Sequence, residues 1–105
     1  MKSKLKTLWG FEGVVVSTDL YSSKIIVVNQ GEQTPYVYHK KQDKTLYVLQ
    51  GTANLKVEGT NKMLNEGERY HIIPKMMYKI HAIKGDVTVL EVGTKLVDDI
   101  VEVEE

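Results

Sequence analysis

The chain has 105 residues and a mass of 11.9 kDa, which is the size of one domain. Its 14 basic residues balance its 14 acidic residues, so it lacks the basic excess with which proteins bind nucleic acids or anionic membranes. It contains no cysteine, which excludes thiol catalysis, disulfide bonds and cysteine-ligated zinc. We therefore expect a small-molecule partner, with no nucleic acid and no membrane.

The beginning of the chain is basic but contains no apolar run of the roughly 7–15 residues that a signal peptide needs. The longest apolar runs, at 25–28 and 46–49, have four residues each. A membrane-spanning helix needs about 18 or more. We expect a cytoplasmic protein.

Short segments rich in β-branched and aromatic residues follow one another along the chain. They cover residues 14–16, 24–28, 36–38, 46–49, 53–57, 69–73, 78–82 and 87–92. Turn residues, many of them glycine, separate these segments and give one strand and turn about every ten residues. The pattern predicts an all-β antiparallel sandwich or barrel that forms one domain over residues 1–105.

The two ends of the chain carry opposite charges. Lys2, Lys4 and Lys6 lie near the start, and five acidic residues, Asp98, Asp99, Glu102, Glu104 and Glu105, lie near the end. We expect both ends to be solvated tails. The apolar positions of 96–101 have helical spacing, and we expect a short turn there that enters a final strand.

The stretch from Gly31 to Gly51 resembles the first motif of the cupin family. That motif consists of a glycine, five residues, His-x-His, three or four residues, a glutamate, six residues and a closing glycine. Its histidine positions fall here on Val37 and His39, and its glutamate position falls on Lys44. The spacing fits without adjustment.

The stretch from Gly67 to Lys79 is similar to the second cupin motif, a glycine followed by Pro-x-Gly-x-x-His. Pro74 holds the proline position, Met76 replaces the second glycine and Lys79 stands at the histidine position. Gly67 lies one residue too far from Pro74, which indicates a bulge or a shifted turn. Residues 52–66, between the motifs, are long enough for the usual hairpin.

A closer resemblance is to the cupin domain of type II mannose-6-phosphate isomerases, which is often fused to mannose-1-phosphate guanylyltransferases. Trp9-Gly10, residues 24–28 and residues 97–104 are similar to that family's pattern. The resemblance implies a single-domain cupin jelly-roll barrel, and it leads us to expect a homodimer.

The resemblance also implies a divalent metal ion, held by two histidines and a glutamate of the first motif and a histidine of the second. Of these four positions only His39 keeps a ligand. The replacements are Val37, Lys44 and Lys79, and neither an aliphatic group nor an ammonium has a lone pair for a cation. We therefore predict that the site holds no metal and that the protein has no cofactor.

Two lysines at former ligand positions leave the predicted pocket positive without a metal. Lys44 and Lys79 would then bind a small anionic or carbohydrate ligand, of the sugar phosphate or nucleotide sugar class. Alternatively, both lysines extend to the mouth of the barrel or pair with Asp43, Glu66 or Glu68.

His39 is the candidate general base, by resemblance to metal-independent cupin sugar epimerases and ketoisomerases. On a strand Val37 and His39 share a face and Tyr38 points away, so Tyr47 and Tyr78 are the better candidates to line the same pocket. The alternative is a structural histidine that is hydrogen-bonded in the interior.

Three functions thus remain open. The first is a metal-free binding module, the second an isomerase or epimerase of mannose-6-phosphate isomerase-like or sugar-nucleotide type that uses His39, and the third a packed barrel for dimerisation. A metal site relocated to His39, His71 and His81 is the least favoured alternative.

Overall fold

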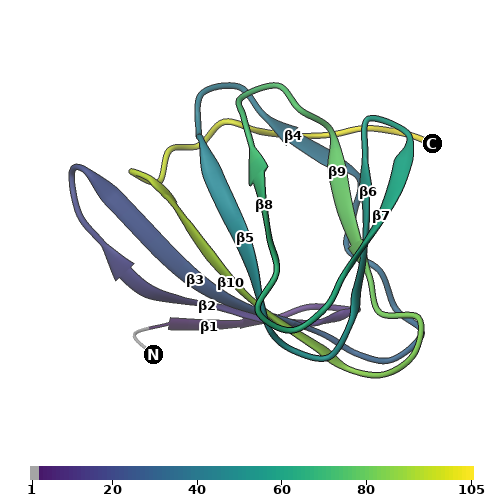
Figure 1. The fold of residues 1–105 in the computed structure, drawn as a ribbon. Coiled ribbons are helices and arrows are strands. Elements are labelled where there is room, and N and C mark those ends of the chain that lie inside the picture. Colours follow the sequence, from purple (N-terminus) through teal and green to yellow (C-terminus); the bar gives the residue numbers. More distant parts are fainter. Residues whose placement is uncertain (1–2) are drawn as a thin grey trace.

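The computed structural model describes residues 3–105, which form eleven β-strands in two antiparallel sheets (Figure 1). The larger sheet contains, in spatial order, β1 (Ser3–Lys6), β2 (Gly10–Ser17), β3 (Tyr21–Val28), β10 (Val87–Thr94), β5 (Lys44–Gln50) and β8 (Arg69–Ile72). The smaller sheet contains β11 (Ile100–Glu102), β4 (Val37–His39), β9 (Tyr78–His81), β6 (Ala53–Val57) and β7 (Thr60–Leu64). This arrangement confirms the predicted all-β jelly roll.

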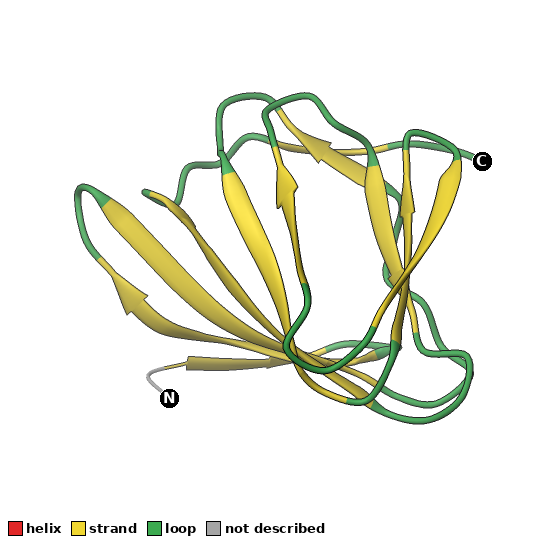
Figure 2. Cartoon of the chain, viewed as in Figure 1, coloured by secondary structure: helices red, strands yellow, loops and turns green. Residues whose placement is uncertain are grey.

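Strand alternation builds the core between the sheets. Leu46 and Val48 of β5 face Leu55 and Val57 of β6, and all four side chains are buried, with half-buried residues between them. Because both sheets bury one face against the other, the hydrophobic effect holds the barrel closed. Strands and loops make up the whole described chain, which offers no helix able to cross a membrane (Figure 2).

Each of the eight predicted segments overlaps a strand, and β11 follows the expected turn at the end. Two further strands, β1 and β7, were not predicted as individual segments. Four of the five residues of β7 are exposed, so its sequence lacks apolar alternation. It forms because it pairs with β6, and this hairpin lies within residues 52–66 as the cupin resemblance implies.

Most charged side chains at the two ends are exposed, as predicted, but the ends are paired strands and not free tails. Lys2 lies outside the described residues, and Lys4 and Lys6 belong to β1, which pairs with β2. At the other end Asp99 is buried and β11 pairs with β4. Glu105 forms ion pairs on the outer face of the smaller sheet. The acidic end is therefore part of the barrel wall.

The start of β2 passes very close to β3 at Gly10. A Cβ atom at this position would lie 1.9 Å from the carbonyl oxygen of Val27, and the φ angle of 155° also favours glycine. Only glycine allows this approach, which brings the neighbouring Trp9 to the inside of the barrel.

We expect Gly10→Ala to lower the free energy of unfolding by about 2–4 kcal/mol, because the strands must separate to admit the methyl group. Urea denaturation measures the loss. Gly85→Ala is the matched control, since a methyl group added there would have no atom within 4 Å, and its effect should stay below about 0.5 kcal/mol. Equal unfolding midpoints for the two variants would contradict the close approach.

Candidate functional site

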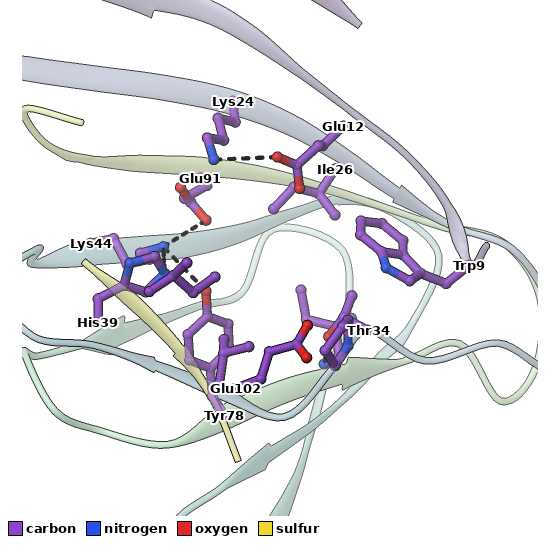
Figure 3. Close-up of a pocket in the computed structure, with 14 residues that line it drawn as sticks. Trp9, Glu12, Lys24, Ile26, Thr34, His39, Lys44, Tyr78, Glu91 and Glu102 are labelled. Atoms are coloured by element: carbon purple, nitrogen blue, oxygen red, sulfur yellow. Dashed lines mark hydrogen bonds and ion pairs between the residues drawn. The ribbon is translucent and has the colours of Figure 1, made fainter. Parts of the chain in front are cut away.

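A cavity of about 170 Å³ lies between the two sheets. Its lining comes from β2, β3, β4, β5, β9, β10 and β11 and from the loops that carry Trp9 and Thr34. His39, Lys44, Tyr78 and Glu91 gather at one side of the cavity, and the indole of Trp9 lies at the other (Figure 3). The cavity therefore combines a polar end with an apolar wall.

The polar end is organised around the ammonium of Lys44, whose residue is only 2% exposed. Lys44 Nζ lies 2.9 Å from His39 Nε2, 3.1 Å from Glu91 Oε1 and 3.2 Å from the hydroxyl of Tyr78. An ammonium has three N–H donors, so these three acceptors use all of them. We call Lys44, His39, Glu91 and Tyr78 the lysine cluster.

Asp99 fixes the orientation of His39 through the ring nitrogen that does not face Lys44. Its Oδ1 lies 2.9 Å from His39 Nδ1, and its Oδ2 accepts hydrogen bonds of 2.8 Å from the backbone amides of Lys41 and Gln42. The carboxylate has only acceptors to offer, so the imidazole hydrogen is assigned to Nδ1. His39 Nε2 then carries the lone pair that accepts from Lys44.

Strand alternation explains why these side chains meet. Lys44 points inward with Leu46 and Val48, and Glu91 points inward with Val89 on the neighbouring strand. On the smaller sheet, Val37 pairs with Tyr78 across β4 and β9, and His39 lies two residues further along β4.

Burial is the largest influence on the pKa values of His39, Lys44 and Tyr78. It lowers the pKa of His39, helped by the charge of Lys44 and opposed by Asp99. It also lowers the pKa of Lys44 against the opposing charge of Glu91, and it raises the pKa of Tyr78 well above 10.0. Burial raises the pKa of Asp99, but hydrogen bonds from His39 and two backbone amides outweigh it and the net shift is downward. His39 and Tyr78 are therefore neutral near pH 7.

The cavity is not positive, contrary to the sequence-based prediction. Besides Lys44 and Glu91, it is lined by the ion pair of Lys24 with Glu12, at 3.4 Å, and by Glu102. Two ammonium groups and three carboxylates give a formal charge of minus one. The prediction failed because Glu12, Glu91 and Glu102 come from strands outside the two motifs.

Two of the five predicted ligand-binding residues do not line the cavity. His39, Lys44 and Tyr78 do. Lys79 lies on the outer face of β9, where its Nζ is 2.6 Å from Glu105 Oε1. Tyr47 lies on the outer face of β5, because the flanking Leu46 and Val48 point inward. The alternative partners predicted for the lysines were also wrong, since Lys44 pairs with Glu91 and Lys79 with Glu105.

Lys79 was misplaced because the second motif was aligned on its proline. If the motif spacing is counted from Gly67 instead, each later motif position falls one residue earlier in the chain. The second-glycine position then falls on Lys75, and the histidine position falls on Tyr78. The structure supports this count, since Lys75 has a positive φ of 69° and Tyr78 points inward. The turn is shifted, and β8 pairs with β5 without a bulge.

The donor set does not fit the metal ion that the cupin resemblance implies. Its four ligand positions now carry Val37, His39, Lys44 and Tyr78, and the ammonium of Lys44 lies directly against the one remaining imidazole. His71 is exposed and pairs with Asp43 at 2.7 Å, and His81 lies on the outer side of β9. Within residues 3–105 no three potential ligands of the His, Cys, Asp or Glu type are grouped for a metal ion.

Acidification should destabilise the protein through His39. The unfolded chain takes up a proton near pH 6.5, and the folded protein resists it because the pKa of His39 is lowered. Stability should therefore be full above pH 6.5 and fall below it, by at most about 1.4 kcal/mol per pH unit, until the pH passes the folded pKa. Urea unfolding from about pH 8 to about pH 5 measures this slope.

His39→Asn should flatten the slope, whereas the exposed His71→Asn should keep it. A wild-type stability that stays constant between pH 6.5 and about pH 5 would contradict a neutral, buried His39.

Solved structures share this fold at low sequence identity. KdgF from Halomonas sp. superposes with a TM-score of 0.78 at 20% identity, over 84% of this chain and 80% of that one. An RmlC-like cupin from Shewanella frigidimarina superposes with a TM-score of 0.79 at 14% identity, over 92% of this chain and 86% of that one. The capsular polysaccharide assembling protein CapF from Staphylococcus aureus superposes with a TM-score of 0.87 at 12% identity, over 98% of this chain and 34% of that one.

No curated protein matches the sequence significantly. The model of one family, described as mannose-6-phosphate isomerase C-terminal, matches residues 1–105. That match extends over both cupin motifs and over the strands that build the lysine cluster. The chain is therefore a member of the mannose-6-phosphate isomerase C-terminal family and has a cupin fold.

Proposed function

We propose that this cupin domain binds a small carbohydrate in its cavity, without a metal ion or another cofactor. The proposal rests on two polar groups of the lysine cluster, one on Tyr78 and one on Glu91, that have no hydrogen-bond partner of their own among the described residues. The Tyr78 hydroxyl accepts from Lys44, and its own O–H has no acceptor among the described residues. Glu91 Oε2 likewise has no donor partner within residues 3–105.

One free donor and one free acceptor on residues that line the cavity suit a ligand with hydroxyl groups, which both accept and donate hydrogen bonds. The raised pKa of Tyr78 keeps its proton in place, so the phenol remains a donor. The low polarity of the surroundings strengthens hydrogen bonds that such a ligand makes there. The polar end of the cavity is therefore suited to an alcohol.

Trp9 supplies the apolar surface that a sugar ring needs. A pyranose has hydroxyl groups at its edge and C–H groups on its faces, and ligand sites commonly combine an apolar wall with a few directed polar groups. Trp9 lies across the cavity from the lysine cluster, with Thr34 and Glu102 between them (Figure 3). A ring stacked on the indole would direct its edge towards Tyr78.

The charges favour an uncharged ring inside the cavity over a phosphate group. All donors of Lys44 are used within the protein, and Lys79 lies outside. A second, shallower depression of about 350 Å³ shares Trp9 and Thr34 with the cavity. The charged residues of its lining are Glu32 and Glu105, and no basic residue of the described chain accompanies them, so this outer depression disfavours a phosphate group as well.

The family and one structural neighbour agree with a sugar ligand. The family is named for an isomerase of a sugar phosphate, and CapF is named for assembling a capsular polysaccharide.

Titration with uncharged aldohexoses should change the tryptophan fluorescence, because Trp9 is the only tryptophan of the chain. Tyr78→Phe should weaken binding about tenfold by removing the donor. Tyr47→Phe is the control and should leave affinity unchanged, since Tyr47 lies on the outer face. If no aldohexose alters the fluorescence or the melting temperature, or if inorganic phosphate binds more tightly than any of them, the proposal is wrong.

A second candidate, a sugar isomerase or epimerase with His39 as base, is favoured by the Asp99–His39 pair. A carboxylate that orients Nδ1 leaves Nε2 as the basic atom. In such a reaction Nε2 would take the proton from the carbon beside a sugar carbonyl, and the Tyr78 hydroxyl would hydrogen-bond to the carbonyl oxygen as negative charge develops on it. Lys44 must first release Nε2, to which it is now hydrogen-bonded.

Hydrogen exchange at that carbon in heavy water separates the enzyme from the binding module. For a base, His39→Asn should abolish exchange of a keto-sugar nucleotide while its affinity stays within about twofold. A wild-type protein that binds the sugar without exchange, or a variant that loses exchange and affinity equally, would contradict a catalytic His39.

A further inference from the structure

The lysine cluster surrounds its ammonium as a binding site surrounds a soluble cation. An imidazole lone pair, a carboxylate and a phenol oxygen converge on Lys44 Nζ within 2.9–3.2 Å. We propose that the cluster is a cation-binding site whose cation the chain supplies itself, as the side chain of Lys44. The proposal concerns the wall of the cavity and does not depend on the sugar proposal.

The three acceptors come from three different strands, β4, β9 and β10. They share no hydrogen bond with one another, so only the ammonium connects them. Removal of its charge would leave a buried carboxylate facing an imidazole lone pair that Asp99 holds in position. Such a constellation attracts a cation from solution, since buried charge without a partner is costly.

The ammonium in this site belongs to a residue at one of the metal-ligand positions of the cupin motif. Lys44 stands where the cupin motif has its glutamate, and Glu91, on β10, provides the carboxylate instead. The distances around Nζ are those of hydrogen bonds and exceed the roughly 2.0–2.2 Å of zinc coordination. A divalent ion would have to displace the ammonium, so the wild-type protein should not bind one at His39.

Shortening Lys44 tests this inference. Lys44→Ala removes three methylene groups and the ammonium, which together correspond to propylammonium. We expect the variant to have a lower melting temperature and to be stabilised by propylammonium, with a saturable, one-to-one response. At about 100 times its Kd propylammonium should raise the melting temperature by roughly 10 °C.

Lys24→Ala is the matched control, because Lys24 also lines the cavity but within residues 3–105 its ammonium hydrogen-bonds only to Glu12, at 3.4 Å. It should show no response to propylammonium, and neither should the wild-type protein. Lys44→Ala combined with His39→Ala should weaken the response to propylammonium, because one of the three acceptors is lost. Equal stabilisation of the Lys24 variant, no stabilisation of Lys44→Ala, or stoichiometric Zn²⁺ binding to the wild type through His39 would overturn the inference.

If Lys44→Ala does not fold under any condition, nitrogen-15 NMR of the wild-type protein decides. The ammonium protons of Lys44 should exchange with water at least about tenfold more slowly than those of Lys24, because all three are hydrogen-bonded in the interior. Exchange as fast as that of Lys24 would overturn the inference.

Discussion

The buried ammonium of Lys44 is the interaction on which the inner end of the barrel depends. Its three hydrogen bonds join β5 to β4, β9 and β10, and these strands belong to both sheets. Removing one partner of a buried ion pair typically costs about 3–5 kcal/mol, because the remaining charge is left without compensation. Replacing Lys44 or Glu91 alone is therefore more costly than replacing the pair by apolar residues of similar volume.

This arrangement also determines what chemistry the cavity offers. A metal ion polarises its ligand as a Lewis acid, whereas a saturated ammonium acts on a ligand only through the groups that it holds. Here those groups are the Tyr78 hydroxyl and the Glu91 carboxylate, and both lie at the cavity wall. A ligand in this cavity would therefore meet directed hydrogen-bonding groups and the surface of Trp9.

Much of the fold was predictable, because alternation and glycine turns act locally. The motif spacing also placed His39 and Lys44 correctly on the inner face. Strand β7 was not predicted because its sequence lacks apolar alternation, and it is a strand only through its pairing with β6. Lys79 was misplaced because a shift of one residue moves a side chain to the other face of a strand.

The partners of the site residues could not be predicted in the same way. Glu91 is the only charged residue of β10 and has apolar neighbours on both sides, a pattern that indicates a buried charge. Nothing in the sequence indicates that it meets Lys44, which is 47 residues away. Asp99 was assigned to a solvated tail because its neighbours are acidic, and only the pairing of β11 with β4 brings it inside.

The bond between Asp99 and His39 has a consequence for how the site is assembled during synthesis. It closes a loop of 60 residues, so the imidazole has no partner on its Nδ1 side until residue 99 has left the ribosome. Strands β5 to β10 can pair earlier, since their contacts are complete by residue 94. The Nδ1 side of His39 is therefore among the last parts of the site to gain its partner, whereas its Nε2 side can meet Lys44 as soon as β4 and β5 are in place.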